Sequence, residues 1–125
     1  MSIQKAVLLN AVLWCLVHLS DKKLMDFNYG TEYYGAPITG IIMFLILCIC
    51  SCICLSYITL KTGNCLYASI FHGAFNVISD LQITSDVFKK SLLGPSPTGL
   101  IGMSVFILLA AYIFIKKLKE IPIEQ

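Results

Sequence analysis

The chain has 125 residues, of which 58% are hydrophobic and 13% are charged, and its formal net charge is +2. Its apolar residues come in runs that are too long for the core helices of a soluble domain of this size, which indicates a polytopic membrane protein. All nine basic residues are lysines, and they are scattered without a basic stripe. Nucleic-acid binding is therefore not expected.

We predict an all-α membrane helical bundle with about four transmembrane helices in one domain, residues 1–125, in the lipid bilayer of the cell membrane. The predicted spans cover residues 3–19, 38–60, 64–83 and 99–118. The turn Lys61-Thr62-Gly63 is short, so the second and third spans should be antiparallel neighbours. Polar loops follow the first span and Leu81, and the first loop carries aromatic side chains typical of an interfacial belt. These are Phe27, Tyr29, Tyr33 and Tyr34.

In the middle of the second span, residues 48–54, every second residue is a cysteine. Alternate residues of a helix point to different sides, so these thiols do not converge as a metal site requires. We interpret them as small apolar packing residues. They are Cys48, Cys50, Cys52 and Cys54.

The third span is the predicted working element because it carries polar side chains at helical spacing. His72 and Asn76 are four residues apart and so share one face, and Asp80 follows a turn later. A polar side chain inside a membrane needs a partner, a metal, a water cavity or a substrate. The other histidine, His18, ends the first span.

We expect His18 and His72 to meet at one wet pocket. Two imidazoles there predict either a metal site, or a site that orients water while Asn76 stabilises an oxyanion. A hydrolase also needs a general base, normally a carboxylate. Asp80 is a candidate base, although it would lie about 12 Å from His72 along a helix, and an aspartate at a helix end is the alternative interpretation.

The residues around both histidines resemble motifs of the CPBP family, the membrane-embedded CAAX-protease and bacteriocin-processing (Abi) proteins. Trp14-Cys15-Leu16-Val17-His18 is similar to its aromatic-xxx-His motif, and His72-Gly73-Ala74-Phe75-Asn76 matches its His-xxx-Asn motif. The stretch from Leu93 to Leu100 is similar to the loop before its final helix. The order and spacing of the motifs make the match more specific than any one of them.

The resemblance implies an intramembrane metalloendopeptidase of prenylated (CAAX-type) or leader-type peptides. In that family a Glu-Glu-xxx-Arg motif supplies the glutamate that activates water. The resemblance implies catalytic roles for His18, His72 and Asn76, with the two histidines as ligands of zinc or another divalent metal. This chain has no Glu-Glu pair and no arginine, and it resembles only the C-terminal half of the family's domain.

Three functions therefore remain open. The first is a truncated endopeptidase that takes its glutamate from elsewhere, and the second is a non-catalytic membrane interaction or self-immunity protein on the same scaffold. The third is a small dimeric four-helix transporter, which needs a buried carboxylate. We also predict self-association, or pairing with a chain that supplies the missing helices, because lipid cannot satisfy exposed polar side chains.

Overall fold

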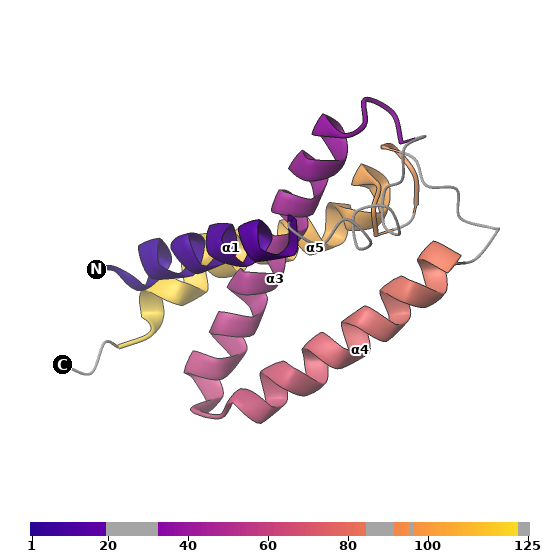
Figure 1. The fold of residues 1–125 in the computed structure, drawn as a ribbon. Helices are drawn as coiled ribbons and strands as arrows, with labels where there is room; N and C mark the ends of the chain where they lie inside the picture. The colour runs from indigo at the N-terminus through magenta and orange to yellow at the C-terminus, as the bar shows by residue number, and fades with distance from the viewer. Residues whose placement is uncertain (20–32, 85–91, 96, 123–125) are drawn as a thin grey trace.

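The computed structural model describes residues 1–19, 33–84, 92–95 and 97–122, without the side chains of residues 82–84. These residues form helices and no strand, in the order α1 (Ile3–Leu19), α3 (Ile38–Thr62), α4 (Cys65–Thr84) and α5 (Leu100–Tyr112) (Figure 1). A π-helical turn, η1 (Ile113–Lys117), and a 3-10 turn, η2 (Leu118–Glu120), continue α5. The predicted all-α class is confirmed, with helices in all four predicted ranges.

Two helical rods are long and apolar enough to cross a membrane, α3 and the continuous rod from Leu100 to Glu120. Helix α1 is also apolar but has 17 residues. Helix α4 is not among these rods within the described residues, in keeping with the polar side chains of His72, Asn76 and Asp80 that it carries. Membrane crossing by all four helices thus stays a prediction.

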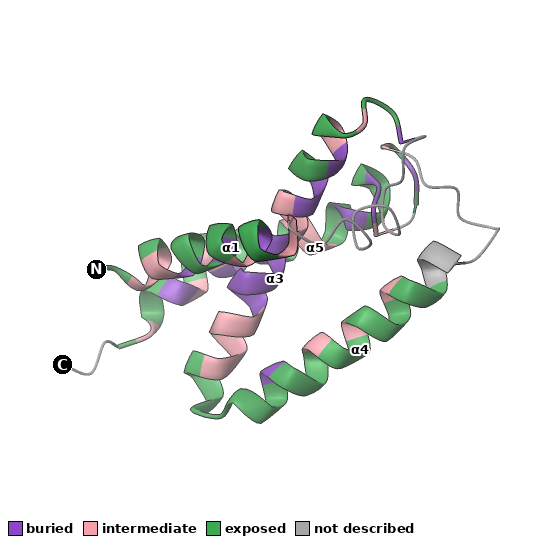
Figure 2. Cartoon of the chain, viewed as in Figure 1, coloured by how far each residue is buried: buried purple, intermediate pink, exposed green. Residues whose placement is uncertain are grey.

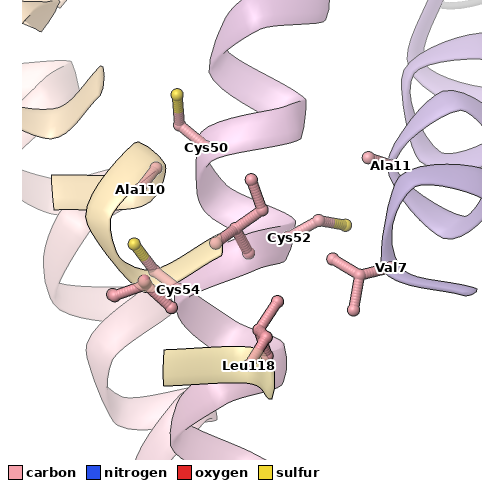
Figure 3. Packing of buried hydrophobic residues seen from close by; sticks show 9 residues of the cluster. Val7, Ala11, Cys50, Cys52, Cys54, Ala110 and Leu118 are labelled. Atoms are coloured by element: carbon pink, nitrogen blue, oxygen red, sulfur yellow. The ribbon is translucent and has the colours of Figure 1, made fainter. Parts of the chain in front are cut away.

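Helix α3 lies at the centre, with α1 and α5 packed against it. Small side chains at the contacts allow close approach of the helices. Figure 3 shows Cys52 facing Val7 and Ala11 of α1, whereas Cys54 lies beside Ala110 and Leu118. The four cysteines of α3 are buried free thiols on different sides of the helix, as their spacing predicts.

Helix α4 leaves the central group after a glycine turn. Gly63 has the left-handed φ of 64° and donates its N–H to the Thr59 carbonyl at 2.8 Å. Asn64 then caps α4, because its Oδ1 accepts the N–H of Leu66 at 2.8 Å. Helix α4 packs mainly on α3, and most of its surface is exposed (Figures 1 and 2).

One aromatic residue of the first loop differs from the prediction of an interfacial belt. Tyr33 is buried, with 2% of its surface exposed, whereas Tyr34 is 77% exposed. The Tyr33 hydroxyl donates to the Thr98 carbonyl at 2.6 Å, so it ties the start of α3 to the segment before α5. Phe27 and Tyr29 lie outside the described residues.

Candidate functional site

A cavity of about 240 Å³ lies between α1, α3, α4 and the segment before α5. Its lining combines aromatic rings with polar side chains, and it includes every site residue that the sequence predicts. The lining residues are Trp14, His18, Phe44, Leu47, Cys48, Ser51, His72, Phe75, Asn76, Ser79, Asp80, Pro97 and Thr98.

Helix α4 brings one polar face to this cavity. His72, Asn76, Ser79 and Asp80 follow one another at intervals that keep them on one side of a helix. The His72 Nε2 and Asn76 Nδ2 atoms lie 3.2 Å apart. An amide nitrogen only donates, so Asn76 donates to Nε2 and the proton of a neutral His72 ring lies on Nδ1.

His18 has the same tautomer but a different hydrogen-bond partner. Its Nδ1 lies 2.9 Å from the Trp14 carbonyl oxygen. A carbonyl only accepts, so Nδ1 must carry the proton, and Nε2 of a neutral ring keeps its lone pair. His18 therefore offers an acceptor to water or a ligand, whereas the Nε2 lone pair of His72 is already bound by Asn76.

Aromatic contacts connect the two histidines across the cavity. The Trp14 ring centroid lies 5.8 Å from that of His18 and 5.3 Å from that of His72. Phe44 of α3 lies 6.1 Å from His18. The structure thus brings His18, His72 and Asn76 to one cavity with Asp80, while their catalytic roles stay predictions.

Several cavity residues were not selected from the sequence. Ser79 follows Asn76 by three residues, so helical spacing alone was enough to place it on the same face. Its Oγ is buried and has no hydrogen-bond partner among the residues that the structure describes. Phe44 and Ser51 have no local sequence signal, because their place depends on how separate segments pack, whereas Thr98 lies in the stretch from Leu93 to Leu100 that resembles the family's loop.

The wall before α5 is held by backbone contacts. Leu100 donates its N–H to the Leu92 carbonyl at 2.8 Å, and Gly102 donates to the Gly94 carbonyl at 3.2 Å. The backbone of Gly99 lies so close to Gly94 that an added Cβ would meet the Gly94 oxygen at 2.2 Å. Together with the Tyr33 hydrogen bond, these contacts place Pro97 and Thr98 at the cavity.

The expected metal has an incomplete set of ligands in the part of the chain that the structure describes. No group of three His, Cys, Asp or Glu side chains there is arranged to hold a metal ion. Structural and catalytic zinc sites use three or four protein ligands. Zinc at His18 and His72 therefore stays a prediction that requires a further ligand, and no step below uses a metal.

Comparison with known proteins identifies the family of this chain. The family model described as "Type II CAAX prenyl endopeptidase Rce1-like" matches residues 1–78, a range that contains His18, His72 and Asn76 and ends before Ser79 and Asp80. A search of curated proteins and a search of solved structures each find no match. Since the family model covers more than half of the chain, this protein belongs to the Rce1-like family of type II CAAX prenyl endopeptidases.

Proposed function

We propose that this chain carries the histidine and asparagine part of an intramembrane endopeptidase site that cleaves prenylated or leader-type peptides. The observation that carries the proposal is the meeting of His18, His72 and Asn76 at one cavity. Family membership supports the CAAX-type protease class. The choice between prenylated and leader-type substrates is a question for the assay below.

The different hydrogen-bond partners of the two rings suggest different roles for the histidines. His18 Nε2 accepts a hydrogen bond from the attacking water and so orients it. Asn76 keeps one amide hydrogen on His72 and has a second that can donate to the carbonyl oxygen as it becomes negative. A donor of this kind typically contributes about 10²- to 10³-fold in rate.

Hydrolysis also requires a group that takes a proton from water. The water oxygen forms a bond to the carbonyl carbon, its proton passes to a base, and the leaving nitrogen takes up a proton as the peptide bond breaks. Asp80 is the carboxylate among the described residues that line the cavity. We propose Asp80 as this base in place of the Glu-Glu-xxx-Arg glutamate, which the sequence lacks.

The test is cleavage of a prenylated peptide and of a leader-type peptide by the purified protein in lipid nanodiscs, with products identified by mass spectrometry. We expect His18→Ala, His72→Ala and Asn76→Ala to lower kcat/KM by about 10²-fold or more. Asn10→Ala is the matched control, because Asn10 is an asparagine of the apolar helix α1 that lies outside this cavity. Parent-like cleavage by all three site variants would overturn the assignment.

A second candidate function is peptide binding without cleavage, and the absence of a Glu-Glu pair and of arginine from the sequence favours it. The same cavity would then hold the peptide, with Asn76 and His18 as hydrogen-bonding groups. Binding of an intact peptide that His72→Ala and Asn76→Ala weaken, together with no product from the parent chain, would support this function over the first.

A further inference from the structure

The ring of Trp14, which is the single tryptophan of the chain, contacts both imidazoles of the site. It meets His18 in an edge arrangement, with an interplanar angle of 72° and centroids 5.8 Å apart. It meets His72 at 59° and 5.3 Å. Both distances lie within the range of favourable aromatic pairs.

The contact between Trp14 and His72 joins two helices that otherwise pack on a third. Helix α1 packs mainly on α3, and so does α4, while α1 and α4 are not among the closely packed helix pairs of the described chain. The separation of His18 from His72 therefore depends on side chains that cross the cavity. Trp14 is one such side chain. A separate stacked pair, Phe75 with Phe106, connects α4 to α5.

Trp14 acts on His18 through two different groups. Its ring packs against the imidazole, and its backbone carbonyl accepts the Nδ1–H at 2.9 Å. A substitution at position 14 removes the ring and keeps the carbonyl. The ring contribution can thus be measured while the hydrogen bond that sets the His18 tautomer is retained.

We propose that Trp14 is a positioning residue whose indole ring sets the separation and tilt of the His18 and His72 imidazoles across the cavity. The inference rests on the proposed function for its consequence in catalysis, whereas the arrangement of the rings can be tested without cleavage. When the ring is removed, His72 loses its contact with α1, and the donor pair His72 and Asn76 moves relative to the water acceptor on His18.

Three variants separate this role from a general packing role. Trp14→Leu removes the ring that touches both histidines, and Trp14→Phe keeps a smaller aromatic ring. Phe44→Leu is the matched control, because Phe44 lies against His18, at 6.1 Å, whereas the ring recorded against His72 among the described residues is that of Trp14. If the environment of the His72 ring changes after substitution of Trp14 and does not change after Phe44→Leu, the effect is specific to the indole.

The measurement is the ¹⁵N chemical shift of the histidine ring nitrogens in protein labelled at histidine. The chain has two histidines, so His18→Gln and His72→Gln assign every signal. We expect Trp14→Leu to shift the signals of both rings, Phe44→Leu to shift those of His18 alone, and Trp14→Phe to shift both by less. If Trp14→Leu does not fold, Trp14→Phe against Phe44→Leu gives the same comparison.

Unchanged His72 signals in the position 14 variants would overturn the proposal, as would equal shifts of His72 in Phe44→Leu. Cleavage provides a separate readout. A displacement of about 1 Å costs on the order of 10²-fold in rate, so we expect a loss of that order in kcat for Trp14→Leu and a partial recovery for Trp14→Phe. A parent chain that does not cleave would count against the proposed function and leave the ¹⁵N result valid.

Discussion

The Nε2 atom of His72 and the Nδ2 atom of Asn76 lie 3.2 Å apart, one turn of α4 from each other. This pair makes the imidazole an acceptor and fixes the orientation of the carboxamide. The second amide hydrogen of Asn76 is thereby directed by a neighbour on the same helix. The orientation of a donor that must meet a developing oxyanion is thus set before any substrate binds.

Asn76→Asp should reverse the direction of the hydrogen bond between positions 76 and 72. A carboxylate only accepts, so His72 Nε2 would have to carry a proton, and a negative charge would stand where an oxyanion develops. We expect cleavage to fall by about 10²-fold or more, measured as kcat/KM on the preferred peptide. Asn64→Asp is the control, because Asn64 is an N-cap, where aspartate is equally favoured. An Asn76→Asp variant that cleaves at the parent rate would contradict the oxyanion role.

Tyr33→Phe should destabilise the protein by detaching the segment before α5. The buried hydroxyl donates to the Thr98 carbonyl at 2.6 Å, and its removal leaves a buried carbonyl without that donor. The expected cost is about 1–3 kcal/mol in the free energy of unfolding, measured by thermal unfolding in a fixed detergent. Tyr34→Phe provides the matched control, since Tyr34 is 77% exposed. Equal stability of the two variants would show that the Thr98 contact contributes nothing.

The same tyrosine should make stability depend on pH in the alkaline range. Burial raises the pKa of Tyr33 above its ordinary value of 10.0. The folded state therefore holds the phenol proton more tightly than the unfolded state does, so the stabilisation is complete below pH 10 and is lost as the pH rises through the raised value. We expect the stability difference between Tyr34→Phe and Tyr33→Phe to shrink above pH 10. A difference that stays constant to pH 12 would contradict this account.

The four helices follow from the sequence because long apolar runs have few alternatives in a membrane. The end of α5 does not follow from it. An uninterrupted helix was predicted to residue 118, and the structure has a π-helical turn over Ile113–Lys117. Within this turn the Phe114 carbonyl accepts a hydrogen bond from the side chain of Gln4, at the start of α1, at 2.9 Å. That contact spans 110 residues of sequence, which local patterns cannot report.

In the site, too, local spacing can be predicted from the sequence, whereas contacts between separate helices cannot. The spacing of His72 and Asn76 places them on one face of a helix without any tertiary information. The contact of Trp14 with His72 depends on both α1 and α4 packing against α3, which no local pattern specifies. The burial of Tyr33 likewise depends on Thr98, 65 residues away in the sequence.

Asp80→Asn tests the identity of the base. The amide is nearly the same size as the carboxylate and cannot take a proton from water, so the variant separates charge and basicity from packing. We expect kcat to fall by about 10²-fold or more, with a smaller change in KM. Asp80→Glu, which restores a carboxylate, should recover part of the rate. An unchanged kcat in Asp80→Asn would remove Asp80 from the mechanism and place the base on a group outside this cavity lining.

Two glycines should respond to alanine in opposite directions. A Cβ at Gly99 would meet the Gly94 carbonyl oxygen at 2.2 Å and the Gly94 nitrogen at 2.7 Å, and both atoms belong to the backbone. Gly99→Ala should therefore displace the segment that places Thr98 and cost about 1–3 kcal/mol in unfolding free energy. At Gly73, which is inside α4, an added Cβ meets no atom of the described residues within 4 Å. Gly73→Ala should raise stability by about 0.5–1 kcal/mol, because alanine loses less backbone entropy in a helix. Thermal unfolding of both variants in one detergent checks the pair, and a Gly99→Ala protein as stable as the parent would contradict the packing of this wall.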